Sequence, residues 1–134
     1  MDTDKHRLDQ KPDLSQYNSL TERIIGCAFT VSNTLGAGFL EKVYENALAH
    51  ELRKSGLQVR QQAALQVSYD GIVVGEYQAD ILVEESVLVE LKAVKAFDEI
   101  HVAQCLNYLK ATGLRLCLLI NFGTARIQVK RIAF

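Results

Sequence analysis

The segment at residues 87–94, VLVELKAV, constrains the fold more than any other feature of this sequence. Its apolar residues are typical of a strand that other elements cover on both faces. Two charged residues, Glu90 and Lys92, nevertheless stand inside it. A buried charge costs several kcal/mol unless it is paired or binds an ion. We therefore expect a covered strand that carries a functional site.

The length and composition are those of one ordinary globular domain. The chain has 134 residues, of which 49% are hydrophobic and 23% charged, close to the averages for such proteins. Residues 1–17 are polar, contain the one proline and show no periodicity. We expect them to form a mobile N-terminal arm, followed by a single domain at residues 18–134.

Charge and hydropathy limit the cellular locations and the binding partners that we expect for this protein. No apolar run approaches the roughly 18 residues of a membrane span, and the charged N-terminus is unlike a signal peptide, so we expect a cytoplasmic protein without a membrane partner. The net charge of −1 argues against a general polyanion binder but leaves a local basic groove open. Arg126, Lys130 and Arg131 are candidate phosphate contacts, although solvated strand faces explain them more simply.

Periodicity predicts the order of the elements. Apolar residues recur at steps of three and four in residues 20–33 and 39–55, which predicts two helices. The period then changes to two in residues 57–71 and 72–85, around a hairpin signal at Asp70-Gly71, and a third strand follows at 86–94. A helix at 98–112 and strands at 114–123 and 125–134 complete the order ααβββαββ. This order indicates an α/β domain with a mixed sheet flanked by helices.

The short turn before the charged strand predicts which acid lies opposite Glu90. If the chain turns back through residues 84–86, antiparallel pairing joins residues whose numbers sum to 170, and Asp80 lies opposite Glu90. Like charges in such a pair are destabilising. Either Lys92, two residues along the same face, or a divalent cation held by both carboxylates would compensate for them.

A Glu-x-Lys pattern in a strand is weak evidence by itself, because a solvated or ion-paired face explains it more often. Asp80 in the matching register and the apolar runs on both strands favour a site instead. A cation beside an ammonium group is typical of phosphate-ester hydrolysis, since the cation polarises a phosphoryl oxygen and the ammonium stabilises developing charge.

These residues resemble the PD-(D/E)XK nuclease superfamily, in which an acid on one strand precedes Glu-x-Lys on the next. Within it the chain is similar to the GxxExxY family, whose pattern stands here at residues 38–44, GFLEKVY. The resemblance implies a restriction-endonuclease-like core and Mg²⁺ or Mn²⁺ as cofactor. Asp80 and Glu90 would be metal ligands, and Lys92 would position or activate the attacking water. Ala79 stands where a proline often precedes the first acid.

The resemblance extends the site to two helices. Exonuclease-like branches of the superfamily often add a helix glutamate to the metal site, which implies Glu41 as the first choice here and Glu45 as the second. Gln104 and Tyr108 resemble a Gln-x-x-x-Tyr motif of the same branches, so Gln104 is a further catalytic candidate. A solvated helix face, an ordinary polar residue and a core tyrosine are the simpler alternatives for these positions.

The sequence therefore predicts a metal-dependent nuclease acting on nucleic acid, with DNA as the expected substrate. A catalytically weak nucleic-acid-binding or assembly module that retains the nuclease fold is the alternative. A hydrolase of another phosphate ester also stays open, because fold and site are shared more widely than substrate. By analogy with related nucleases we expect a possible homodimer.

Overall fold

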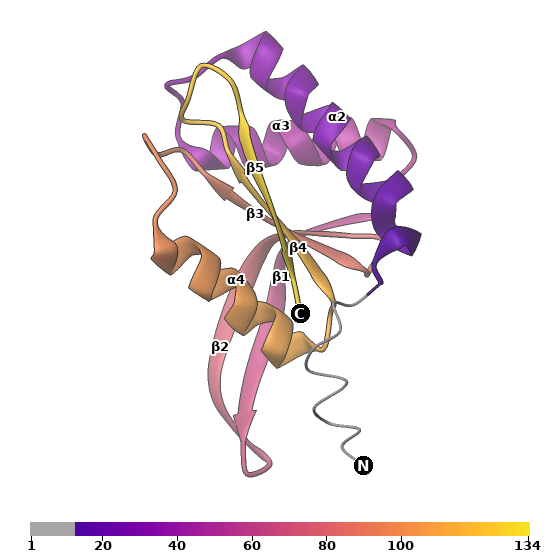
Figure 1. Cartoon of the computed structure of the whole chain (residues 1–134), viewed down its shortest axis with the longest axis vertical. Helices are drawn as coiled ribbons and strands as arrows, with labels where there is room; N and C mark the ends of the chain where they lie inside the picture. The colour runs from indigo at the N-terminus through magenta and orange to yellow at the C-terminus, as the bar shows by residue number, and fades with distance from the viewer. Residues whose placement is uncertain (1–12) are drawn as a thin grey trace.

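The computed structural model describes residues 13–134, so residues 1–12 of the predicted arm lie outside the described residues. The described chain begins with a 3-10 turn, η1 (Ser15–Tyr17), beside which Leu14 and Tyr17 pack against the core. The elements that follow are α2 (Asn18–Leu35), α3 (Glu41–Lys54), β1 (Val59–Tyr69), β2 (Ile72–Val83), β3 (Val87–Lys92), α4 (Glu99–Thr112), β4 (Leu116–Asn121) and β5 (Gln128–Ala133). The predicted order of helices and strands is confirmed (Figure 1).

The five strands form one mixed sheet in the order β1-β2-β3-β4-β5. Strands β3 and β4 are parallel, and every other neighbouring pair is antiparallel. A parallel pair needs a crossover connection, which α4 provides here. Every residue of β4 is buried, because this strand lies inside the sheet and has helices on both of its faces.

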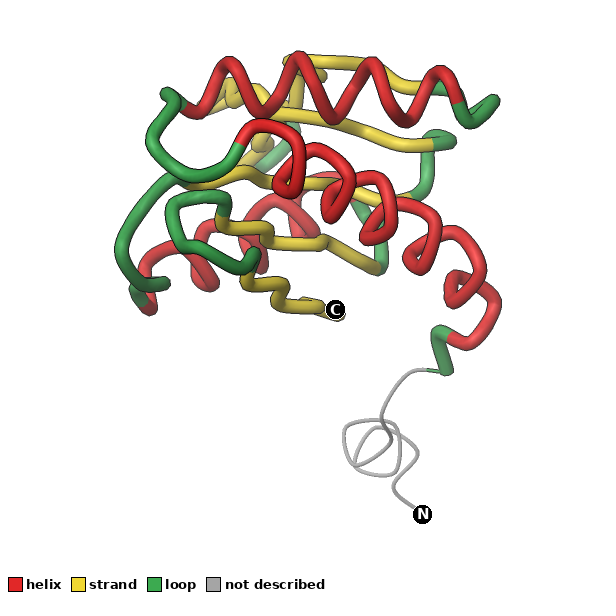
Figure 2. Tube along the Cα trace, turned by 90° about the horizontal axis from the view of Figure 1, so that it is seen from above, coloured by secondary structure: helices red, strands yellow, loops and turns green. Residues whose placement is uncertain are grey.

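The sheet divides the hydrophobic core into two clusters, and helices cover the one on each face. Helices α2 and α3 pack against Val89 and Leu91 of β3, whereas α4 packs against Leu88. Figure 2 shows α2 and α3 lying in front of the strands. Coverage of both faces explains why β3 is apolar, and alternation along the strand places Glu90 on the α4 side. Glu90 is only 4% exposed, so the ionisable side chain that the sequence predicts inside a covered strand is buried.

The β1–β2 hairpin turns at Asp70 and Gly71, as the sequence predicts. Both residues have left-handed backbone conformations, with φ of 53° and 76°, which a two-residue hairpin turn requires. The hairpin projects beyond the rest of the sheet (Figure 1), and its outer part exposes Tyr69 and Ile72. Within residues 13–134, no helix has the length and apolar character needed to cross a membrane.

Candidate active site

Asp80 and Glu90 lie where the pairing of β2 and β3 ends. The pairs Val83↔Val87, Leu82↔Leu88 and Ile81↔Val89 have the predicted register, and the next level along is that of the two acids. At this level, hydrogen bonds between side chains and backbone replace the backbone–backbone hydrogen bonds of the β2–β3 ladder. The Asp80 backbone N–H donates to Glu90 Oε1 over 3.0 Å, and the Leu91 N–H donates to Asp80 Oδ2 over 2.8 Å. The two carboxylates are thus neighbours at the edge of the paired region.

Both carboxyl groups are harder to ionise than usual. Burial raises the pKa of Glu90 to about 8, with a further contribution from the negative charge of Asp80 and a smaller opposing one from Lys92. Burial also raises the pKa of Asp80, which the charges of Glu45 and Glu41 raise further, while the hydrogen bond from the Leu91 N–H lowers it. The protein alone therefore leaves this pair short of positive charge.

Lys92 ends β3, and a network from β4 fixes the chain around it. Lys92 lies beside Asn121 in the parallel pairing of β3 and β4. The buried Asn121 amide holds the backbone of Val94: Oδ1 accepts from the Val94 N–H over 3.0 Å, and Nδ2 donates to the Val94 carbonyl over 2.9 Å. The Phe122 N–H donates to the Lys92 carbonyl over 2.8 Å. A Cβ at Gly123 would overlap the Val94 backbone. Sequence reasoning missed Asn121, and the one signal for it is a polar residue ending an apolar strand.

Tyr44 fixes the loop that leads into α3. Its ring is fully buried and stacks on Phe122, with centroids 4.7 Å apart. Its hydroxyl donates to the Gly36 carbonyl over 2.6 Å and accepts from the Phe39 N–H over 3.1 Å. The loop therefore enters the helix at a defined place, and Glu41 is the first residue of α3. Tyr44 is a core residue, which was the simpler alternative for it.

The two helix glutamates have different surroundings. Glu45 is buried, and both of its oxygens are engaged: Oε2 accepts from Lys42 Nζ at 2.9 Å and Gln61 Nε2 at 2.7 Å, and Oε1 accepts from Gln62 Nε2 at 2.7 Å. Glu41 is exposed, and no hydrogen bond links its carboxylate to another described residue. Glu41 is therefore the helix acid with an available carboxylate, and its charge reaches Asp80.

Gln62 joins Glu45 to Asp80 and has a strained backbone. Its φ is 52°, a left-handed conformation that a residue with a side chain rarely adopts within a strand. Successive strand residues normally point to opposite faces, yet Gln61 and Gln62 both donate to Glu45. The Gln62 amide also lies 3.5 Å from Asp80 Oδ1. Sequence reasoning missed this residue, because nothing local in QQAAL indicates a left-handed φ.

Gln104 and Tyr108 form a hydrogen-bonded pair on α4. Gln104 Nε2 donates to the Tyr108 hydroxyl over 2.8 Å. Tyr108 is buried, and burial raises its pKa, with an added effect of the negative charges of Glu90 and Asp80. The tyrosine of the predicted motif is therefore within reach of the charges of the acid pair, and the glutamine is joined to it by a hydrogen bond.

The donor set at Asp80 and Glu90 fits a hard divalent cation. Mg²⁺ binds carboxylate oxygens, accepts one or two from the protein and keeps waters for the rest of its shell. Glu90 is buried and Asp80 half-buried, and a nearby cation would favour the ionised form of each carboxyl. Within residues 13–134, no group of three or more histidine, cysteine or acidic side chains is gathered closely enough to hold a metal ion.

The mixed sheet, its flanking helices and the acids at the end of the β2–β3 pairing define an α/β protein with a restriction-endonuclease-like fold. A family model described as the PD-(D/E)XK nuclease superfamily matches residues 18–132, and the chain belongs to that superfamily. No curated protein matches the chain.

Two solved structures are similar to this one. The structure of SSO0001 has a TM-score of 0.52 at 16% sequence identity, and the match covers 96% of this chain and 72% of the SSO0001 chain. At this identity the likeness shows the fold alone. The structure of an alkaline exonuclease, LHK-Exo from Laribacter hongkongensis, has a TM-score of 0.44 at 15% sequence identity, and the match covers 92% of this chain and 72% of the exonuclease chain.

Proposed function

We propose that the protein is a metal-dependent nuclease that hydrolyses phosphodiester bonds in nucleic acid, with DNA as its substrate. The observation that carries this proposal is the pair Asp80 and Glu90 at the end of the β2–β3 pairing, with Lys92 two residues further along the same buried strand. Membership of a nuclease superfamily supports the reaction class.

In this proposal Asp80 and Glu90 hold Mg²⁺ or Mn²⁺, and the available carboxylate of Glu41 is the third candidate ligand. The cation, when bound, supplies a Lewis acid for the phosphoryl group. Support comes from the chemistry of the donors and from the raised pKa of both carboxyls, since a nearby positive charge favours their ionised forms.

The remaining side chains position the reacting groups or stabilise charge on them. The Lys92 ammonium orients the attacking water or stabilises charge on the phosphate oxygens. Glu45 has both oxygens engaged, so we assign it the role of orienting Gln62, which in turn lies against Asp80. Gln104 contacts the substrate or its water from the α4 side, and its hydrogen bond to Tyr108 fixes its rotamer.

We also assign the chain to the GxxExxY family within the superfamily. The support is structural. Hydrogen bonds of the Tyr44 hydroxyl hold the loop that contains Gly38, and α3 then begins at Glu41, whose charge reaches Asp80. A tyrosine three residues after the glutamate thus has a positioning role. A cytoplasmic location and a homodimer stay predictions.

One observation favours the alternative, a weakly catalytic module that binds nucleic acid and keeps the fold. Glu41 and Glu45 do not form a compact acidic cluster with the Asp80 pair in the described part of the chain. A site with two protein carboxylates holds a cation less tightly than one with three or four, so turnover would depend on the substrate phosphate completing the shell.

Incubation with labelled single- and double-stranded DNA and RNA, in Mg²⁺, Mn²⁺ or EDTA, distinguishes these functions. We expect cleavage of DNA with either metal and none in EDTA. Lys92→Met should abolish cleavage and leave binding intact, because methionine matches the aliphatic part of lysine and lacks its charged ammonium group. Cleavage that survives EDTA would exclude the metal mechanism, and binding without cleavage would favour the alternative.

A further inference from the structure

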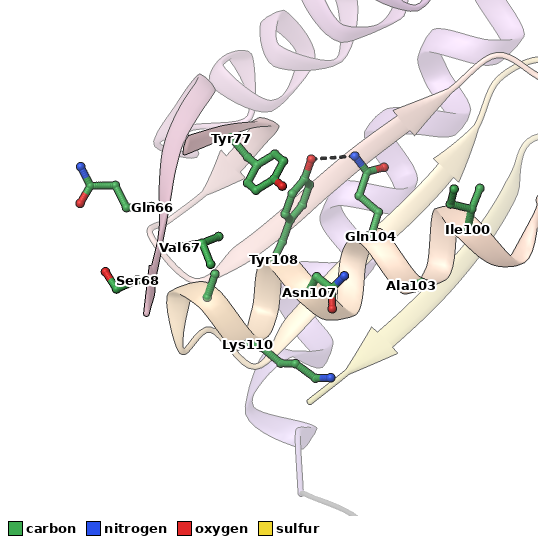
Figure 3. A pocket seen from close by; sticks show the side chains of 11 residues that line it. Gln66, Val67, Ser68, Tyr77, Ile100, Ala103, Gln104, Asn107, Tyr108 and Lys110 are labelled. Atoms are coloured by element: carbon green, nitrogen blue, oxygen red, sulfur yellow. Dashed lines mark hydrogen bonds between the residues drawn. The ribbon is translucent and has the colours of Figure 1, made fainter. Parts of the chain in front are cut away.

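A cavity of about 820 Å³ opens between α4 and the β1–β2 hairpin. Val67 and Tyr77 line it from the hairpin, and Ile100, Gln104 and Tyr108 line it from α4 (Figure 3). Its volume is in the range of about 300–1,000 Å³ typical of small-molecule sites. Neither Asp80 nor Glu90 lines this cavity, so the cavity is distinct from the acid pair.

Two tyrosines form its aromatic wall. Tyr108 is buried and held by Gln104, whereas Tyr77 is 51% exposed. Their ring centroids lie 5.8 Å apart, and the ring planes are tilted by 50°. Tyr77 therefore rests against a fixed neighbour and still presents much of its ring to a ligand. An aromatic ring exposed in this way is a stacking surface for a nucleobase, and such stacking tolerates any base.

The polar groups of the cavity suit an uncharged planar ligand better than a phosphate. Asn107 is exposed, and its amide has no hydrogen-bond partner among the described residues. Gln104 uses Nε2 on Tyr108, and its carbonyl oxygen likewise has no protein partner among residues 13–134. Amide donors and acceptors match the edges of a base. Of the residues that line the cavity, Lys110 is the single cation, and its ammonium lies 5.9 Å from the centroid of the Phe134 ring.

Tyr108 links the cavity to the acid pair. Its ring belongs to the aromatic wall, and the charges of Glu90 and Asp80 both reach its hydroxyl. A base stacked on Tyr77 would thus belong to a nucleotide next to the phosphate at Asp80 and Glu90. Bases in a duplex are already stacked on both faces, so a base must leave the helix to enter, which is least costly in a single strand.

We propose that this cavity binds an unpaired nucleobase beside the scissile phosphate, and that the protein thereby prefers single-stranded or frayed nucleic acid to intact duplex. This inference rests on the proposed nuclease function. The chemical class of the ligand is a nucleobase of an unpaired nucleotide. The stacking wall consists of Tyr77 and Tyr108, and the groups for the base edge are the amides of Gln104 and Asn107.

Binding in EDTA tests the cavity independently of catalysis. Fluorescence anisotropy would give the dissociation constants of a labelled single strand, of the same strand with one abasic nucleotide at each position in turn, and of its duplex. The proteins are wild type, Tyr77→Ala, Tyr77→Phe and the control Tyr69→Ala. Tyr77 and Tyr69 are both exposed hairpin tyrosines, but Tyr69 does not line the cavity.

For wild type we expect tighter binding of the single strand than of the duplex, and a loss of roughly ten-fold when one particular position is abasic. Tyr77→Ala should lose a similar factor on the intact strand and no more on the abasic one. Tyr77→Phe and Tyr69→Ala should behave as wild type. Equal binding of all abasic strands, or full abasic sensitivity in Tyr77→Ala, would overturn the inference. Base-sensitive binding without cleavage in Mg²⁺ would instead contradict the nuclease function and leave this cavity assignment standing.

Discussion

At the scale of single residues, the site depends on carboxyl groups placed where they ionise poorly. Glu90 is buried on the α4 side of β3, and its pKa is raised to about 8 by burial and by Asp80. The metal-free protein therefore holds a group whose proton affinity is far higher in the folded than in the unfolded state. This difference makes stability depend on pH in a way that can be measured.

We predict that metal-free wild type loses stability as the pH rises from about 5 to about 8. In that window the unfolded Glu90 is ionised and the folded one is still protonated, so the folded state binds more protons and the free energy of unfolding falls. The raised pKa of Asp80 acts in the same direction. Glu90→Gln should show a flatter dependence. Urea unfolding in EDTA measures this, with the exposed Glu22→Gln as control; identical slopes for wild type and Glu90→Gln would contradict it.

Gln62 allows a test of the strained strand. With its φ at 52°, a glycine should fit the backbone better than an alanine, by about 1 kcal/mol. Both Gln62→Gly and Gln62→Ala lose the amide that donates to Glu45, so the comparison isolates the backbone. We predict that Gln62→Gly is the more stable variant by chemical denaturation. An alanine variant as stable as the glycine variant would show that this position is not left-handed.

At the scale of elements, the loop between α2 and α3 is held by one side chain. Tyr44→Phe removes the hydroxyl that donates to the Gly36 carbonyl and accepts from the Phe39 N–H. We predict a loss of about 1–2 kcal/mol in the free energy of unfolding, together with faster proteolysis at residues 36–40. Thermal melts and limited proteolysis measure these effects. The exposed Tyr69→Phe should change neither, and a Tyr44→Phe variant with wild-type melting and proteolysis would disprove the role of the hydroxyl.

The elements were predictable because each leaves a local signal. Apolar spacing predicted the three α-helices and five strands in order, though not the 3-10 turn η1, and the short turn at residues 84–86 predicted the register that brings Asp80 opposite Glu90. The supports of the site leave no such signal. Gln62, Asn121 and the hydrogen bonds to Glu45 depend on which distant segments meet, and a left-handed φ in mid-strand is imposed by those contacts rather than by the local sequence.

At the scale of the whole molecule, helices on both faces of the sheet bury the central strands while β2 and β3 diverge at one end. Charges on α3 reach Asp80 there, and the charges of both acids reach Tyr108 of α4, which lines the cavity beside the hairpin. A site made by diverging strands is stabilised by the core but is itself short of positive charge. We therefore claim that a divalent cation supplies that charge and that activity depends on this cation.

A Mg²⁺ titration of wild type and Asp80→Asn, following melting temperature and nucleic-acid cleavage in the same samples, tests this claim most directly. Asparagine keeps an oxygen that can accept from the Leu91 N–H and removes a negative charge that those of Glu45 and Glu41 repel, so in EDTA the variant should be as stable as wild type or more so. Wild type should gain melting temperature and cleave as Mg²⁺ is added, because the ion binds the folded state, whereas the variant should do neither. The claim would be contradicted if Asp80→Asn melted well below wild type in EDTA and yet kept both its Mg²⁺ shift and its cleavage.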